Sequence, residues 1–187
     1  ASRAMALGMK SAMASSVRSP SSASAIDAAL YDAEVRTIWH GGWLFAGFEI
    51  EIPKPGDFLT LAVDGSSVLV IRDDAGAVRA FHNVCRHRGS QLCRNESGHV
   101  RAIVCPYHSW TYSRQGALVA CAGMHDGVDK AALGLKPVHV DTTAGLVYVS
   151  LAATPPAFDG LRERFGATAK PQGFDRARIA KVIDYEV

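Results

Sequence analysis

The sequence feature that most constrains the fold is a repeated pairing of a cysteine with a histidine. Cys85-x-His87 is followed by residues 88 to 104 and then by Cys105-x-x-His108. Each pair ends an apolar segment typical of a β-strand, and turn-forming residues mark both stretches as loops. Thiolates and imidazoles are protein ligands that transition metals bind readily. The chain is therefore predicted to bring two loops face to face around a metal centre.

The four candidate ligands, two cysteines and two histidines, leave two kinds of metal centre open. Two cysteines and two histidines suit a tetrahedral zinc ion, which is the simplest hypothesis. Zinc fingers, however, typically place a cysteine pair first and a more widely spaced histidine pair later. Here each loop supplies one thiolate and one imidazole, as in a two-iron, two-sulfide cluster with both cysteines on one iron and both histidines on the other. The spacing favours the iron cluster, and zinc remains the alternative.

The segments around these loops predict a mostly β domain of small antiparallel sheets. Residues 58–81 contain three short apolar runs broken by Asp64-Gly65 and by Asp74-Ala75-Gly76, which are hairpin signals. Apolar residues at helical spacing predict one short amphipathic helix over 26–39. Further strands are expected within four segments, namely 41–50, 98–105, 116–120 and 144–151. Many brief strands with glycine-rich turns favour a sandwich or barrel-like core.

The two ends of the chain differ from this domain in composition. Residues 1–25 are rich in alanine and serine, with three basic residues and no acid, so they are expected to be a disordered tail or, alternatively, an organelle transit segment. Residues 155–187 are proline-marked and charged and predict a linker. The linker is expected to end in a strand, 180–187, that begins a further domain. The predicted domain itself spans 26–154.

Composition argues against several classes of protein. The formal net charge of +2 gives no argument for a nucleic-acid partner. The apolar runs are too short to cross a bilayer, so no membrane partner is expected. Four cysteines without a secretory signal favour reduced thiols in a cytoplasmic setting, or in an organelle if residues 1–25 are a transit segment.

The two motifs resemble those of a known family. With Arg88 and Gly89 after the first pair and with Tyr107 and Trp110 around the second histidine, the chain resembles the Rieske domain of non-haem iron oxygenases. The likeness is to the N-terminal part of the α subunit of ring-hydroxylating dioxygenases and demethylating monooxygenases. It covers about Tyr31 to Leu151 and includes the lead-in stretches 38–47 and 52–57. It implies a Rieske-type fold holding a 2Fe-2S cluster, with one iron on the two cysteines, Cys85 and Cys105, and the other on the two histidines, His87 and His108.

The resemblance also implies a functional setting. In that family the domain takes electrons from a flavin reductase or a ferredoxin and passes them to a mononuclear Fe(II) in a catalytic domain, within a homotrimer. That iron is held by two histidines and a carboxylate. After His108 only His125 and His139 follow, with no acid at a matching spacing. The chain is therefore expected to hold no catalytic residue of its own and to transfer electrons. A weak preference goes to the branch that acts on quaternary ammonium compounds. A stand-alone Rieske ferredoxin is the alternative.

Three positions depart from related patterns. Ser109 stands where the oxygenases usually have glycine after the second histidine. Tyr107 replaces the extra cysteine of respiratory-chain Rieske proteins, and Trp110 replaces their serine that bonds to a cluster sulfur. Tyr112 remains as a possible donor to sulfur. Because fewer hydrogen bonds to sulfur lower the potential, we expect a value in the lower part of the range of about −150 to +300 mV.

The remaining candidates have weaker signals. Six arginines near the loops face one acid, Glu96, which leaves a local charge of six minus one, or +5; this surface either docks an acidic electron donor or is simply solvated. The arginines are Arg79, Arg86, Arg88, Arg94, Arg101 and Arg114. His82 is expected to have a structural role or, alternatively, to contact a metal ligand without binding the metal itself. Buried apolar roles are expected for Cys93, Cys121, Trp39 and Trp43, and no role is assigned to His40, His99, His125 and His139.

Overall fold

Strand β3 (Ser66–Arg72) lies at the centre of the molecule and is buried on both of its faces. Alternate residues of a strand point to opposite sides. Val68 and Val70 therefore pack into one core cluster, whereas Leu69 and Ile71 pack into a second. The continuous apolar run of β3 is explained by this double burial. One sheet is thus shared between a supporting core and the core that carries the two Cys/His loops.

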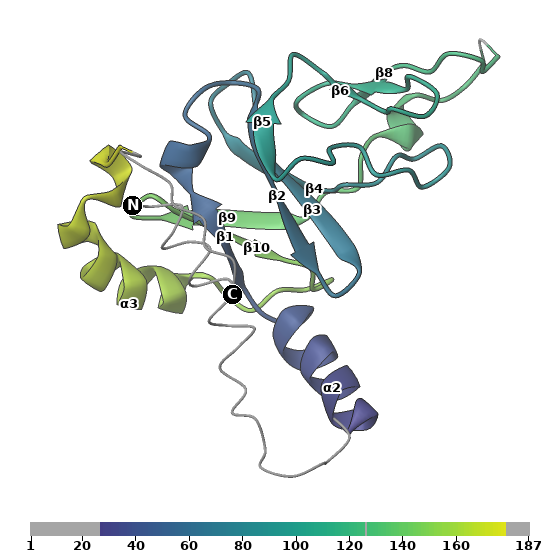
Figure 1. Ribbon diagram of the computed structural model, residues 1–187. Helices are drawn as coiled ribbons and strands as arrows, with labels where there is room; N and C mark the ends of the chain where they lie inside the picture. The colour runs from purple at the N-terminus through teal and green to yellow at the C-terminus, as the bar shows by residue number, and fades with distance from the viewer. Residues whose placement is uncertain (1–26, 126, 179–187) are drawn as a thin grey trace, which may run out of the picture.

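The computed structural model describes residues 27–125 and 127–178, which form three antiparallel sheets (Figure 1). In the central sheet the order is β4-β3-β2-β5, with β2 at Asp57–Val63, β4 at Val78–His82 and β5 at Ser97–His99. The supporting sheet has the order β1-β10-β9, formed by Leu44–Phe48, Leu146–Ser150 and His139–Thr143. The third sheet, β6-β7-β8, consists of Ile103–Val104, Thr111–Tyr112 and Leu118–Ala120. The prediction of a mostly β fold of small antiparallel sheets is confirmed.

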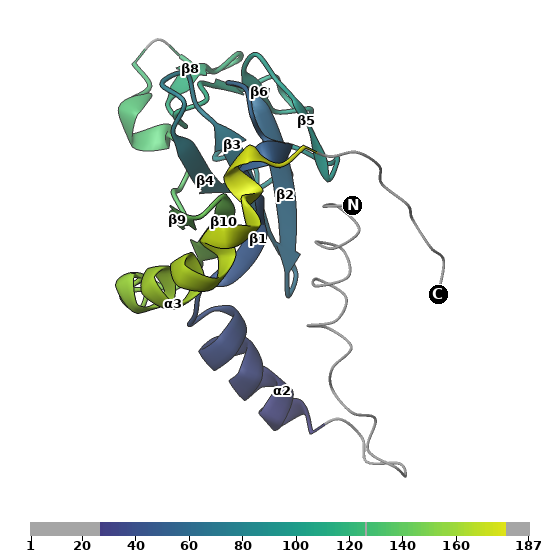
Figure 2. The ribbon, with the colours of Figure 1, turned by 90° about the vertical axis from the view of Figure 1, so that its left-hand side faces the viewer.

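Helical segments lie at the two ends of the described chain. Helix α2 (Ala28–Glu34) is capped by Asp27, whose carboxylate accepts a hydrogen bond from the Ala29 N–H at 3.0 Å. It continues into a π-helical turn, η1 (Val35–Trp39), and both project from the sheets (Figure 1). Helix α3 (Asp159–Ala169) lies beside the β1-β10-β9 sheet, away from β6 and β8 (Figures 1 and 2). Short 3-10 turns also occur within and after the sheets, at Glu49–Glu51, Ala131–Leu133, Lys170–Gln172 and Phe174–Arg176.

Three sequence-based expectations differ from the structure. The single strand expected over 98–105 is wrong, because the chain bends at 100–102 and its two ends enter different sheets as β5 and β6. Strand β9 was not predicted, since its residues lack clear alternation. The expected linker contains helix α3. Tertiary contacts stabilise α3, because Arg162 pairs with Asp141 on β9 at 2.7 Å.

The expectations for residues 1–25 and for a strand at 180–187 lie outside the described residues. The boundaries at 26–154 and 155–187 stay predictions. Within the described part of the chain, no helix is both long enough and apolar enough to cross a membrane.

Candidate metal centre

The two Cys/His stretches form loops of the same construction. The first loop, residues 85–90, follows β4, and the second, residues 105–110, follows β6. In the first loop the Cys85 N–H donates to the Ser90 carbonyl at 2.8 Å; in the second the Cys105 N–H donates to the Trp110 carbonyl at 2.8 Å. Each cysteine thus begins a turn that closes five residues later. The two loops thus share one backbone pattern, with the histidine two residues after the cysteine in the first and three residues after it in the second.

A left-handed residue closes each turn. Gly89 has a φ of +70° and Ser109 a φ of +57°, and their N–H groups donate to the carbonyls of Cys85 and Cys105 at 3.0 and 3.1 Å. Glycine adopts positive φ freely, whereas a residue with a Cβ does so at a cost of about 1–2 kcal/mol. Ser109 therefore occupies a strained backbone position that glycine suits better. Serine in place of the glycine usual in the oxygenases is expected to cost stability here.

We expect Ser109→Gly to stabilise the protein by about 1 kcal/mol, since it relieves the positive-φ strain at a modest entropic cost. The measurement is the urea unfolding midpoint followed by far-ultraviolet circular dichroism. The reverse change, Gly89→Ser, is the matched control, because a Cβ there has nothing within 4 Å and only the backbone term changes. It should destabilise by a similar amount. Shifts of the same sign for the two variants, or no shift in either, would contradict the strain assignment.

The four predicted ligand side chains meet between the loops as two close pairs. The thiols of Cys85 and Cys105 are buried, with exposed fractions of 3% and 2%, and lie within hydrogen-bonding reach of each other. The imidazole rings of His87 and His108 have centroids 4.8 Å apart and an interplanar angle of 69°. The thiol pair faces the protein core and the imidazoles are half-buried. One end of the site is therefore apolar and the other reaches towards solvent.

Aromatic rings fix the orientation of both imidazoles. His87 stacks on the buried ring of Trp110, with centroids 4.7 Å apart and an interplanar angle of 7°. Tyr107, which is exposed, lies over His108 with centroids 3.8 Å apart. The Nδ1 atom of His108 and the Nε1 atom of Trp110 are buried and have no hydrogen-bond partner among the described residues. A buried polar atom without a partner is unfavourable, so the His108 ring nitrogen is available to a ligand.

The surroundings of Cys105 favour its thiolate form, the form that binds metals. Burial alone would raise the pKa of the Cys105 thiol. The backbone N–H groups of Tyr107 and His108 and the side chains of Cys85 and Ser90 outweigh burial, so its pKa is lowered from the ordinary value. Hydrogen-bond donors that converge on a sulfur are typical of metal thiolates.

Tyr112 supports the other sulfur. Its hydroxyl lies 3.3 Å from the Cys85 Sγ and accepts a hydrogen bond from the Arg86 N–H at 3.0 Å. Because the hydroxyl already accepts from Arg86, its own proton is directed to the sulfur. Burial, followed by the hydrogen bond with Cys85, raises the pKa of Tyr112, which keeps that proton in place. The suggestion that Tyr112 donates to a site sulfur thus has matching geometry.

Tyr112→Phe is expected to lower the midpoint potential of the metal centre by about 40 mV. A donated hydrogen bond strengthens as negative charge builds on the sulfur, and a net difference of about 1 kcal/mol corresponds to about 40 mV for one electron. Spectroelectrochemical titration measures the change. Tyr107→Phe is the matched control and should leave the potential within about 10 mV, because the Tyr107 hydroxyl makes no hydrogen bond to Cys85 or Cys105 and the ring contact with His108 is kept. A fall of equal size in both variants would contradict the role of Tyr112.

The residues present fit a two-iron cluster. Among the described residues no three His, Cys, Asp or Glu side chains gather closely enough to hold one metal ion. In a 2Fe-2S cluster with mixed ligation each iron takes only two protein ligands, and two close pairs are what the loops provide. When bound, such a cluster supplies one-electron transfer. The protein's own residues orient the imidazoles, direct donors to the sulfurs and keep water from the thiol side.

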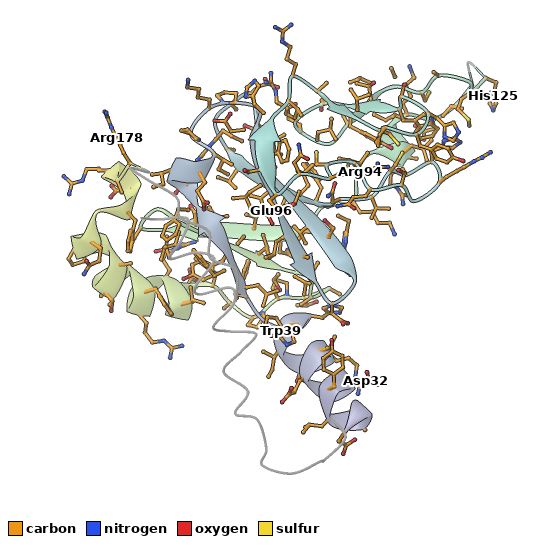
Figure 3. The ribbon with its side chains drawn as sticks, in the orientation of Figure 1. Asp32, Trp39, Arg94, Glu96, His125 and Arg178 are labelled. Atoms are coloured by element: carbon orange, nitrogen blue, oxygen red, sulfur yellow. The ribbon has the colours of Figure 1, made fainter. Side chains whose placement is uncertain are left out.

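The other cysteines, histidines and tryptophans considered from the sequence do not belong to the two loops. Cys93 is buried, and burial raises the pKa of its thiol to about 11, whereas Cys121 is partly exposed. Trp39 packs on the supporting core, where η1 meets the sheets (Figure 3). Trp43 donates to the Pro156 carbonyl at 2.7 Å. His125 lies at the far tip of the segment between β8 and the 3-10 turn at Ala131–Leu133 (Figure 3).

The estimate of a +5 arginine surface needs correction. Arg79 pairs with the buried carboxylate of Asp73 at 2.9 Å, and Arg114 pairs with Asp74. These two acids lie in the β3–β4 turn, outside the stretch that the charge count covered. Four arginines remain for the surface around the loops, namely Arg86, Arg88, Arg94 and Arg101.

Sequence reasoning missed Asn83, which anchors the first loop. Asn83 is fully buried; its Nδ2 donates to the Cys93 carbonyl at 2.6 Å and to the Ser67 Oγ at 3.0 Å, and its Oδ1 accepts from the Cys93 N–H at 2.9 Å. The side chain thus ties the strand before Cys85 to the chain beyond the loop. The available signal was an amide side chain within an apolar run, two residues before the first ligand.

Comparisons with known proteins agree with this geometry. The profile of the Rieske [2Fe-2S] domain matches residues 42–133. A glycine betaine monooxygenase oxygenase subunit of Pseudomonas aeruginosa (strain UCBPP-PA14) is 44% identical over 155 residues, which make up 82% of this chain and 36% of that protein. The α subunit of biphenyl 2,3-dioxygenase of Rhodococcus jostii (strain RHA1) is 37% identical over 136 residues, 71% of this chain and 30% of that protein.

Solved structures give the same result. A crystal structure of the quaternary ammonium Rieske monooxygenase CntA with L-carnitine has a TM-score of 0.69 and 28% identity, covering 77% of this chain and 44% of that one. A naphthalene 1,2-dioxygenase structure has a TM-score of 0.67 and 36% identity, covering 75% of this chain and 33% of that one. The chain spans about a third of the length of the curated relatives it matches.

Proposed function

This chain belongs to the Rieske [2Fe-2S] domain family through residues 42–133, and on that premise we propose that it is the electron-transfer domain of an oxygenase α subunit. Cys85 and Cys105 hold one iron of the cluster, and His87 and His108 hold the other. The observation that carries the proposal is the meeting of a buried thiol pair and a half-buried imidazole pair between two loops of the same construction. The thiol iron is then shielded, and electrons enter and leave through the imidazole side.

The first test is the chemistry of aerobically purified protein. We expect a brown protein with two irons and two acid-labile sulfides per chain, and a rhombic EPR signal of low average g after reduction with dithionite. Imidazole ligands on the reducible iron account for that signal. Colourless protein with one tightly bound zinc and no sulfide would overturn the electron-transfer proposal in favour of a structural zinc module.

The wider proposal concerns the protein of which this domain is part. Electrons come from a flavin reductase, directly or through a ferredoxin, and go to a mononuclear Fe(II) in a catalytic domain that hydroxylates or demethylates a substrate with O₂. The full-length protein is a homotrimer that acts in the cytoplasm. The length of the curated relatives supports this, since the chain matches about a third of each. Sequencing the transcript beyond the Val187 codon separates this proposal from a stand-alone ferredoxin.

A quaternary ammonium compound is the proposed substrate class. The support is the 44% identity with a protein named glycine betaine monooxygenase oxygenase subunit, against 37% for a biphenyl dioxygenase subunit. Oxygen uptake by the full-length protein with its reductase should rise with a quaternary ammonium substrate and not with naphthalene. The opposite preference would overturn the substrate class and leave the electron-transfer role intact.

A further inference from the structure

A cavity opens on the outer side of the first loop. It has a volume of about 450 Å³ and lies between that loop, the end of β4 and the chain just before β9. The His82 N–H donates to the Lys136 carbonyl at 3.0 Å, which fixes two of its walls together. Its lining residues are His82, Val84, Cys85, Arg86, Gly89 and Lys136. None of the functions discussed above uses this cavity.

The cavity is positively charged. Lys136 and Arg86 both line it, and none of the described residues in its lining is acidic. Among the described residues neither cation forms an ion pair with an acid, and the Arg86 Nε is buried without a hydrogen-bond partner. Burial, followed by the charge of Lys136, lowers the pKa of His82, so this ring is neutral at pH 7 and adds a hydrogen-bonding group. Two cations with one unsatisfied buried donor form a site that lacks a counter-ion.

We propose that this cavity binds a multiply charged oxyanion, such as a phosphate group or a dicarboxylate, between Lys136 and Arg86. Two cations favour a dianion over a monoanion because each adds its own attraction. The cavity is larger than one phosphate group, and its lining is mostly apolar, with the exposed side chain of Val84 as one contributor. These features suit a small anionic metabolite. A carboxylate presented by an acidic protein surface has the same chemistry, and the experiment separates the two sources.

The position of the cavity beside Cys85 links anion binding to the midpoint potential of the proposed metal centre. Cys85 lines the cavity and is one of the proposed ligands. An anion bound beside a thiolate opposes further negative charge there, so it binds the oxidised protein more tightly and lowers the midpoint potential. A tenfold difference in affinity corresponds to a shift of 59 mV for one electron. This coupling rests on the proposed function; binding itself does not.

Binding is tested by equilibrium dialysis of radiolabelled inorganic phosphate against the purified chain, at constant ionic strength set with sodium chloride. We expect saturable binding of one phosphate, weakened at least tenfold in Lys136→Gln and in Arg86→Gln. Arg88→Gln is the matched control: it removes the same charge from the same loop, but Arg88 does not line the cavity, so affinity should change less than threefold. Absent or non-saturable binding, or equal losses in all three variants, would overturn the site.

Coupling is tested on the iron-loaded protein by titrating the midpoint potential with phosphate at the same ionic strength. We expect a fall that saturates with the dialysis affinity and is lost in Lys136→Gln. Binding without a change in potential would overturn the coupling. If the protein holds no iron, the proposed function fails, and the dialysis result still decides the anion site. A triglutamate peptide that displaces phosphate at lower concentration than phosphate itself would assign the site to a presented carboxylate; weaker displacement would assign it to a free anion.

Discussion

Cys105→Ala is expected to abolish the iron–sulfur cluster, reducing iron and acid-labile sulfide from two of each per chain to less than about a tenth. The thiol of Cys105 is 2% exposed and lies within reach of Cys85, so alanine removes one of the two proposed ligands of the buried iron. Visible absorption, iron and sulfide assays measure the loss. Because cluster binding stabilises only the folded state, the thermal midpoint should fall as well.

The other two cysteines supply the matched control. Cys93→Ala and Cys121→Ala remove a thiol of the same size without a role at the metal, since neither residue lies in the two loops. Both variants should keep the full visible spectrum. Cys93→Ala should cost about 1 kcal/mol in stability, because its side chain is buried in the core beside the site. Loss of iron in either control, or normal iron in Cys105→Ala, would contradict the ligand assignment.

Gly56→Ala is expected to destabilise the fold by at least about 3 kcal/mol and to lower the thermal midpoint by about 6–12 °C. Gly56 has a φ of +94°, and a Cβ there would lie 2.3 Å from the Val100 carbonyl oxygen. That oxygen belongs to the backbone, so it cannot move aside as a side chain would. Gly56 also bonds to two neighbouring segments, donating to the Arg72 carbonyl and accepting from the Val100 N–H, each at 2.9 Å. The substitution therefore strains the junction from which the chain leaves β5 towards the second loop.

Gly65→Ala separates the cost of the steric clash at Gly56 from the cost of placing alanine at a positive φ. Gly65 has a similar φ of +73°, yet a Cβ there meets nothing within 4 Å. Alanine at this position should cost only about 1 kcal/mol. Urea unfolding of both variants, with the iron content matched, gives the comparison. Equal losses for the two would show that the close approach of Val100 to Gly56 does not govern stability.

The local sequence pattern was sufficient to predict the two hairpins of the central sheet. The breaks at Asp64-Gly65 and Asp74-Ala75-Gly76 fall between β2, β3 and β4 in the structure, because a turn and the alternation on either side are properties of neighbouring residues. The local pattern did not predict the bend within 98–105, which divides the single expected strand between two sheets. It also failed at α3, whose segment has little helical amphipathicity and is stabilised by contacts such as Arg162 with Asp141. Those contacts join residues distant in sequence, so no local signal encodes them.

The sequence by itself determined the candidate ligands, their spacing and the loops that carry them, because residue type and turn preference depend only on neighbouring residues. Only the tertiary structure decided that the thiols are buried and the imidazoles half-buried, that Asn83 anchors the first loop from outside it, and that Arg79 and Arg114 are neutralised by Asp73 and Asp74. The cavity between the first loop and Lys136 likewise exists only after folding. The physical reason is that burial, ion pairing and cavities depend on which distant segments share a core. The central sheet sets this, because β2, β3 and β4 each pack residues into both cores.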